Sequence, residues 1–283
     1  MSRNRERMGL PTPENTTPPQ QALQENPGFS FVVPTEFVEL PSGGRFYSEN
    51  HPLHGQTSIE IKQMTAKEED ILTSRTLLKS GIAIDRVLQS LVMDKQINVD
   101  SLLVGDRNAI LVAARISGYG NEYTTSVDCP SCGTTQANTF DLNEVGPQDP
   151  SQAAELGVVD NEDGTFTTVL PRTGLNVEFK LLNGQDEKNM LAQAESDRKR
   201  KRPEKNVTTQ IRNMVVSVNN DDSPQAINYL IENMPSLDAR HLRTCYKLTA
   251  PNIDMTQLFT CEECGHEQDM EVPLTADFFW PDR

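Results

Sequence analysis

The sequence is short of several features that identify whole classes of protein. Its 283 residues contain no apolar run near the roughly 20 residues that a membrane-spanning helix needs. The basic start "MSRNRERMGLPTPENTTPPQ" has no apolar segment behind it, so we do not expect a secretory signal. Positive charge is scarce, with 26 Lys and Arg against 41 Asp and Glu, a formal net charge of -15. This balance argues against the whole chain binding nucleic acid through phosphate contacts.

The motifs that identify common enzyme classes are also missing from the sequence. It contains no phosphate-binding glycine loop, no GxSxG elbow, no HExxH and no evident pairing of a nucleophile with a base. We therefore expect a protein that is not an enzyme and has no catalytic residues.

Cysteine is rare, but its placement is informative. Four of the five cysteines form two CxxCG turns, "CPSCG" and "CEECG", whose members are Cys129, Cys132, Cys261 and Cys264. Strand-like sequence flanks both turns, so each is predicted to be the tip of a β-hairpin, a zinc knuckle. Four thiolates close a tetrahedral site, and Zn²⁺ is the metal expected there, in a structural role. This usage is typical of a reducing compartment.

The two cysteine pairs lie far apart because the chain reads as a tandem duplication. A shift of 132 positions aligns "GDRNAILVAARISGYGNEYTTSVDCPSCG" without a gap on "LDARHLRTCYKLTAPNIDMTQLFTCEECG". Upstream, "VELPSGG" resembles "TVLPRTG" and "IEIKQMTAKEEDIL" resembles "VEFKLLNGQDEKNML". We predict an α+β fold in which a unit of strand, helices and knuckle hairpin occurs twice, with the two knuckles sharing one four-cysteine zinc site.

The predicted organisation has three parts. Residues 1–34, rich in Pro, Gln, Asn and Thr, form an arm that is either disordered or ordered by a partner. Residues 35–148 form repeat one, and residues 149–283 form a connector, repeat two and an aromatic C-terminal tail. Patterning predicts helices over 65–81, 83–93, 104–120, 185–202, 208–219, 223–234 and 236–249. Thr65 and Glu68 have capping-box spacing, and Asp106 is predicted to cap the third helix.

Several other residues and segments are expected to have ordinary structural roles. The basic run 198–205 is expected to be a solvated helix end, with docking to an acidic protein surface as the functional alternative. Cys245 is expected to be a buried small hydrophobe, and His266 a neighbour of the metal site rather than a ligand. His51 and His54 are expected to be loop residues. The aromatic residues Phe278, Phe279 and Trp280 either fold back on the core or anchor in a partner.

Three stretches carry a resemblance to a known family. The sequence has an L-P-S-x-G-x-x-Y entry, the segment "MTAKEEDIL", and a D-R-x-x-I-L…R…Y-G run that leads into C-P-x-C-G. In this order they resemble the baseplate hub assembly proteins of T-even-like contractile-tailed bacteriophages. The resemblance is clear over about 37–145 and weaker through repeat two, and it assigns no catalytic residues.

The resemblance implies a non-enzymatic structural or assembly component of a phage tail baseplate, in its hub region. Its partners would be other baseplate and tail proteins, without nucleic acid or membrane insertion, and assembly in several copies stays open. The protein would be made in the host cytoplasm and reside in the virion tail. The alternative is a nucleic-acid-binding zinc-ribbon protein that uses 198–205 as its electrostatic contact.

Overall fold

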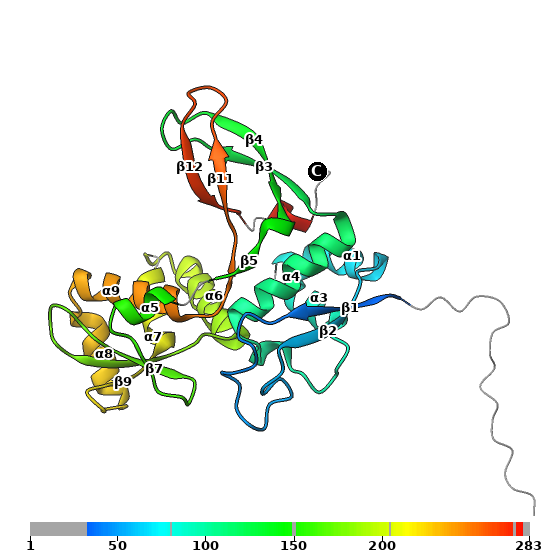
Figure 1. The fold of residues 1–283 in the computed structure, drawn as a ribbon. Helices are drawn as coiled ribbons and strands as arrows, with labels where there is room; N and C mark the ends of the chain where they lie inside the picture. Colours follow the sequence, from blue (N-terminus) through cyan, green and yellow to red (C-terminus); the bar gives the residue numbers. More distant parts are fainter. Residues whose placement is uncertain (1–32, 80, 149–150, 204, 274–275, 280–283) are drawn as a thin grey trace, which may run out of the picture. The chain divides into compact units, whose positions relative to one another are not determined.

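The computed structural model describes residues 33–79, 81–148, 151–203, 205–273 and 276–279. The predicted arm therefore lies almost wholly outside the described residues, as does Trp280. From Pro34 onward the chain forms one unit of mixed helices and small antiparallel sheets (Figure 1). The predicted mixture of helix and sheet is confirmed.

The first part of the chain pairs two strands and packs helices against them. Its elements are β1 (Thr35–Glu39), β2 (Ser58–Lys62), α1 (Ala66–Thr73), α2 (Arg75–Lys79), α3 (Ala83–Leu91), the 3-10 turn Val99–Ser101 and α4 (Val104–Tyr119). β1 and β2 are antiparallel, with Phe37 opposite Glu60. The helix predicted over 65–81 is instead two helices, because the backbone turns extended at Ser74, with ψ of 107°. The capping box of Thr65 and Glu68 is present.

The start of α4 differs from its prediction. Asp106 does not cap the helix: the capping position is Leu103, and it makes no side-chain cap. Asp106 lies inside the first turn, fully buried. Its carboxylate accepts hydrogen bonds from the Ser42 N–H, the Ser42 hydroxyl and the Tyr47 hydroxyl. It therefore fixes the loop after β1 onto the helix.

The middle of the chain contains the first knuckle hairpin and the connector. Its elements are β3 (Glu122–Asp128), β4 (Thr135–Asp141), the 3-10 turn Leu142–Glu144, β5 (Gly146–Pro147), α5 (Ser151–Glu155) and β6 (Val159–Asp160). β3 and β4 form a two-stranded antiparallel sheet, as predicted for a knuckle. β5 pairs with a short strand from much later in the chain, β10 (Ile253–Asp254).

The second part of the chain also contains strands, helices and a hairpin. Its elements are β7 (Thr165–Val169), β8 (Asn176–Lys180), α6 (Gly184–Lys199), α7 (Asn206–Met214), β9 (Val215–Val218), α8 (Pro224–Asn233), α9 (Ser236–Thr249), β11 (Thr256–Thr260), β12 (Glu267–Glu271) and the 3-10 turn Ala276–Phe279. The helix predicted over 208–219 is wrong in its second half, where β9 pairs with β8 in a four-stranded sheet of order β6-β7-β8-β9. β-Branched valines favour such a buried strand over a helix end.

Two of the three C-terminal aromatic residues, Phe278 and Phe279, fold back on the core. Phe278 and Phe279 are buried, and the ring of Phe278 meets that of Tyr123 edge-on at 5.1 Å. The buried guanidinium of Arg115 donates to the Phe278 carbonyl at 2.7 Å and to the Gly120 carbonyl at 2.7 Å. These two phenylalanines therefore stabilise the base of the first hairpin and are not free to anchor in a partner.

Candidate metal centre

Each CxxC pair sits in a hairpin turn of the same construction. In the first turn the Gly133 N–H donates to the Cys129 carbonyl at 2.8 Å, and in the second the Gly265 N–H donates to the Cys261 carbonyl at 2.9 Å. Gly133 and Gly265 have φ of 73° and 66°. This left-handed conformation is open to glycine at little cost, which explains why a glycine follows each pair.

The two turns bring the four predicted cysteines into one cluster. The sulfur atoms of Cys129, Cys132, Cys261 and Cys264 all lie within 4.8 Å of one another. The closest approaches, Cys129 to Cys264 and Cys132 to Cys261, are both 3.7 Å. A tetrahedral zinc with bonds of about 2.3 Å requires sulfurs about 3.8 Å apart, whereas a disulfide requires about 2.05 Å. The cluster has the dimensions of a site that could hold a metal ion.

The two hairpins lie side by side (Figure 1), and the side chains of two glutamines bridge them. The Gln136 side chain donates to the Thr260 carbonyl and accepts from the Glu262 N–H, at 3.1 and 2.9 Å. The Gln257 side chain donates to the Asp141 carbonyl and accepts from the Asp141 N–H, at 2.7 and 3.1 Å. Gln136 comes from β4 and Gln257 from β11, so each hairpin supplies one bridging amide.

The cluster is half sheltered from solvent. Cys129 and Cys261 are each 1% exposed, whereas Cys132 and Cys264 are exposed. A hydrogen bond with the Thr134 side chain, supported by the Thr134 backbone, lowers the pKa of Cys132 to about 6. At Cys264 the His266 backbone favours the thiolate, but removal of water and the three neighbouring thiols outweigh it and raise the pKa to about 12. A cation among the sulfurs would relieve this mutual repulsion.

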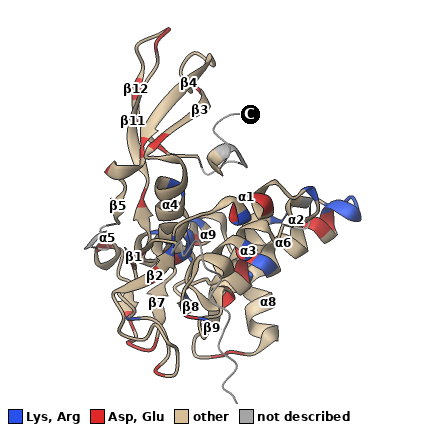
Figure 2. Cartoon of the chain, turned by 90° about the vertical axis from the view of Figure 1, so that its right-hand side faces the viewer, with Lys and Arg blue, Asp and Glu red and all other residues tan. Residues whose placement is uncertain are grey.

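Charge near the cluster favours a cation. The segments 121–141 and 256–272 contain no Lys or Arg. Their acidic residues are Glu122, Asp128, Asp141, Glu262, Glu263, Glu267, Asp269 and Glu271. Figure 2 shows this difference, with red along the hairpins and blue gathered beside α2 and α6. The hairpins therefore attract cations and repel phosphate groups.

The histidines singled out in the sequence lie outside the sulfur cluster. His266 is 3.4 Å from the Gln268 side chain and is not among the clustered ligand atoms. His51 hydrogen-bonds the Ser101 hydroxyl at 2.8 Å and stacks on Tyr47 with ring centroids 4.4 Å apart. His54 contacts the Tyr47 carbonyl at 2.7 Å. His51 and His54 lie in a loop, as predicted; His51 links this loop to the 3-10 turn Val99–Ser101, and His54 contacts the backbone of the loop itself.

Cys245 is buried, as predicted. It is fully inaccessible and lies 3.7 Å from the Thr168 hydroxyl and 3.4 Å from His241. Burial raises the pKa of the Cys245 thiol. It is therefore a packing residue, separate from the four clustered cysteines.

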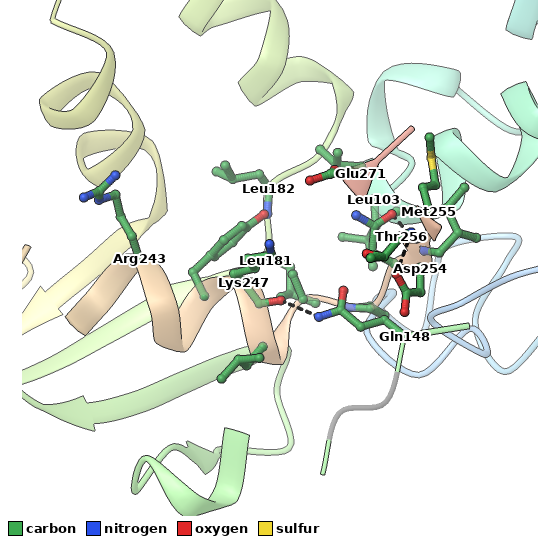
Figure 3. Close-up of a pocket in the computed structure, with 18 of the residues that line it drawn as sticks. Leu103, Gln148, Leu181, Leu182, Arg243, Lys247, Asp254, Met255, Thr256 and Glu271 are labelled. Carbon is green, nitrogen blue, oxygen red and sulfur yellow. Dashed lines mark hydrogen bonds between the residues drawn. The ribbon is translucent and has the colours of Figure 1, made fainter. Parts of the chain in front are cut away.

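A cleft of about 590 Å³ lies where the start of α4 meets the end of α9 (Figure 3). Polar groups along it are bonded within the chain: the Gln148 side chain donates to the Lys247 carbonyl at 3.0 Å, and the Leu182 N–H donates to the Tyr246 hydroxyl at 3.3 Å. In the view of Figure 3, Arg243 lies on the opposite side from Asp254 and Glu271. The cleft therefore lies along the contact between segments that are distant in the sequence.

The sequence interpretation missed the buried carboxylates that fix the loops. Asp106 is one, and Asp238 is the other: its carboxylate accepts from the Arg172 and Thr173 N–H groups at 2.7 and 3.1 Å. The 132-residue shift had aligned these two aspartates, and that alignment was the available signal. Polar residues on otherwise apolar helix faces are buried only when they are bonded.

The comparison with protein families decides what kind of protein this is. Residues 33–280 match the family described as T4 bacteriophage base plate protein. The chain belongs to this family. The predicted resemblance is confirmed, and the match covers both hairpins of this base plate protein together with all four clustered cysteines. The comparisons with curated proteins and with solved structures found no match. Within the described residues, no helix combines the length and apolar character needed to cross a membrane.

Proposed function

We propose that this protein is a non-enzymatic structural or assembly component of the phage tail baseplate, in its hub region, stabilised by a structural zinc ion. One observation carries the proposal: four cysteines from two distant hairpins converge within 4.8 Å in a chain of the base plate family. Its partners would be other baseplate and tail proteins, reached by assembly in the host cytoplasm. Family membership supports a place in the virion tail.

The proposed zinc ligands are Cys129, Cys132, Cys261 and Cys264. Four thiolates would leave no open position for water or substrate, so the ion would serve as a cross-link. Each hairpin supplies two ligands, and an isolated two-stranded hairpin is only marginally stable in water. The free energy of metal binding would therefore stabilise the joined hairpins.

We further propose that the two halves, 35–148 and the part of 149–283 after the connector, are a tandem duplication. Matching buried carboxylates support it. Asp106 accepts from the Ser42 N–H, and Asp238 accepts from the Arg172 N–H. Ser42 and Arg172 occupy the same place in the aligned loops "LPSGG" and "LPRTG". The same backbone hydrogen bond at aligned positions is hard to obtain from unrelated segments.

The helix starts after β2 and β8 support the duplication in the same way. Lys62 pairs with Glu68 at 2.6 Å, and Lys180 pairs with Asp186 at 2.9 Å. In both cases the acid is the third helical residue and closes a capping box. A later segment then pairs on the same side of each: Ile61 forms an isolated bridge with Val92, and Phe179 pairs with Val215 of β9.

The alternative of a nucleic-acid-binding zinc ribbon has less support. Its contact would be the basic run 198–205, which is exposed at 198–203 and 205, yet the hairpins themselves carry only acidic charge. Phosphate binding would appear as affinity that falls steeply with salt on mixed DNA and RNA. We expect no such binding, and its detection would favour the alternative.

Native mass spectrometry before and after a strong chelator tests the metal proposal. We expect one zinc per chain, lost in Cys129→Ser and equally in Cys261→Ser. Cys245→Ala, which removes the buried thiol outside the cluster, is the control and should retain the ion. Two ions per chain, or an ion retained by either hairpin variant, would contradict a shared site.

The baseplate proposal is tested separately by quantitative peptide analysis of purified phage tails. Peptides of this chain at a fixed ratio to tail proteins would identify a baseplate subunit. Peptides found in assembling lysates and missing from finished tails would identify an assembly factor. Absence from both would overturn the baseplate role and leave the metal result untouched.

A further inference from the structure

The outer edge of β1 has unused backbone hydrogen-bonding groups. The Gln63 N–H donates to the Pro34 carbonyl and the Leu40 N–H donates to the Thr57 carbonyl, so the even-numbered residues of β1 face β2. Backbone direction alternates along a strand. The N–H and C=O groups of Thr35, Phe37 and Glu39 therefore point outward, and among the residues that the structure describes no strand pairs with them.

The corresponding edge in the second part of the chain is covered. There β7 pairs with β6, with Val159 opposite Thr167 and Asp160 opposite Phe166. An uncovered edge is a template for another strand, and proteins usually blunt or cover such edges. β1 instead presents an aromatic ring, because Phe37 is 71% exposed. A cavity of about 900 Å³ near the end of β1 is lined in part by Phe37 and Glu39 and in part by Thr57 and Ser58 on the β2 side.

We propose that the outer edge of β1 binds the same edge of a second copy of this chain, antiparallel and centred on Phe37. The two-stranded sheets β1–β2 of the two copies would then join into one four-stranded sheet. Each Phe37 would exchange its N–H and C=O with the Phe37 of the other copy, and each Thr35 would do so with Glu39. The proposal depends on neither the metal nor the baseplate role.

Self-complementarity is the reason for choosing a second copy. Strand edges related by a two-fold axis form an isologous contact, in which the same patch faces itself. In this register Glu39 faces Thr35 and Glu36 faces Val38, so no glutamate opposes a glutamate despite the acidic net charge. The two Phe37 rings become neighbours on one face, a favourable cross-strand pair.

The proposed contact between the two β1 strands is small, so we expect a low affinity. A five-residue strand pair buries far less than the roughly 1,200 Å² of a stable interface. We therefore expect a weak dimer that forms at high protein concentration, as within an assembly.

Sedimentation equilibrium of the full chain, up to about 1 mM, measures the association. Phe37→Pro removes the outward N–H without affecting the ladder to β2, because proline is tolerated on a strand edge. Losing both central hydrogen bonds should weaken the dimer about thirtyfold. Phe37→Ala, which keeps the N–H, should weaken it less. Tyr229→Ala is the matched control, since Tyr229 is 72% exposed on α8, and should change nothing.

Charge variants at Thr35 test the register even if the proline variant folds poorly. Thr35→Lys places a cation opposite Glu39 of the other copy and should tighten the dimer about three- to tenfold at low salt. Thr35→Glu should weaken it by a similar factor. A monomer at all concentrations, whether the edge is vacant or covered by residues 1–32, overturns the proposal. So does a dimer that is insensitive to positions 35 and 37.

Discussion

Glu68 shows how a fully buried carboxylate can remain charged. Its side chain is inaccessible, and burial acts to raise its pKa. Hydrogen bonds from Lys62, Ser90 and Thr65 together outweigh burial and lower the pKa of Glu68 to about 2, against an ordinary value of 4.5. The charged form is thus favoured in the folded state. The stabilisation is fully present above about pH 4.5 and is lost as the pH falls toward 2.

Glu68→Gln should abolish this part of the acid sensitivity. The free energy of unfolding of the parent should fall by up to about 3 kcal/mol between about pH 5 and pH 2 from this group. In the variant that component should be missing, and stability at neutral pH should be lower by about 1–3 kcal/mol because Lys62 loses its ion-pair partner. Urea unfolding over a pH series measures both effects.

Comparing variants separates this effect from release of the proposed metal at low pH, which would be common to all of them. Glu69→Gln, exposed on the same helix, is the control and should keep the parent's slope. Equal acid sensitivity in Glu68→Gln and its parent would contradict the role of Glu68.

For single residues, the sequence predicted those roles that depend on the spacing of nearby residues along the chain. The capping box of Thr65 and Glu68 is a three-residue pattern, and all four clustered cysteines follow from two CxxCG turns. It did not predict the role of Asp106, whose three donors come from residues about 60 positions away. An aspartate near a helix start has the same local signature whether it caps the helix or holds a distant loop.

The start of α4 is pressed against the segment after α9. A Cβ atom added to Gly105 would lie 1.9 Å from the Pro251 carbonyl oxygen and 2.8 Å from the Asn252 Cα. Both are backbone atoms and cannot rotate away. The close approach of these two elements therefore requires glycine at this position.

Gly105→Ala should destabilise the protein by about 1–3 kcal/mol through overpacking. Gly118→Ala, later in the same helix, is the matched control. Its Cβ would meet Met64 at 3.4 Å, an ordinary contact, so helix propensity should make it neutral or stabilising by up to about 1 kcal/mol. Thermal unfolding of the pair measures the difference. Equal melting temperatures would contradict the close packing.

For whole helices and strands, the sequence-based predictions were wrong where contact with a distant segment determined the secondary structure. The segment 215–218 follows a helix and continues its apolar pattern, yet it forms β9 because β8 offers a partner. The turn at Ser74 divides a stretch whose composition suits one helix. The hairpins were predicted well because a CxxCG turn fixes its own geometry.

In the molecule as a whole, the two hairpins depend on one another. Besides the sulfur cluster, the side chains of Gln136 and Gln257 link β3–β4 to β11–β12, and the Tyr123 hydroxyl donates to the Pro273 carbonyl just after β12. The sheet β7–β8 contains none of the four clustered cysteines, and its buried face includes Val177 and Phe179. A metal cross-link should therefore affect the hairpins far more than that sheet.

Chelation should speed amide hydrogen exchange in both hairpins at least about tenfold and leave β7 and β8 close to their original rates. Exchange measured by mass spectrometry with and without chelator checks this. Cys129→Ser should reproduce the chelated pattern without chelator. Uniform acceleration would mean that the ion supports the whole fold, and unchanged hairpins would contradict a stabilising cross-link.

The distance between the two cysteine pairs along the chain has a consequence for biosynthesis. Cys129 precedes Cys261 by 132 residues, which takes roughly 7–26 s at about 5–20 residues per second. During that time Cys129 and Cys132 are free thiols, because the other two cysteines of the cluster have not yet been synthesised. With the proposed zinc site, zinc limitation or oxidative stress during growth would therefore affect the nascent chain, before the finished protein exists.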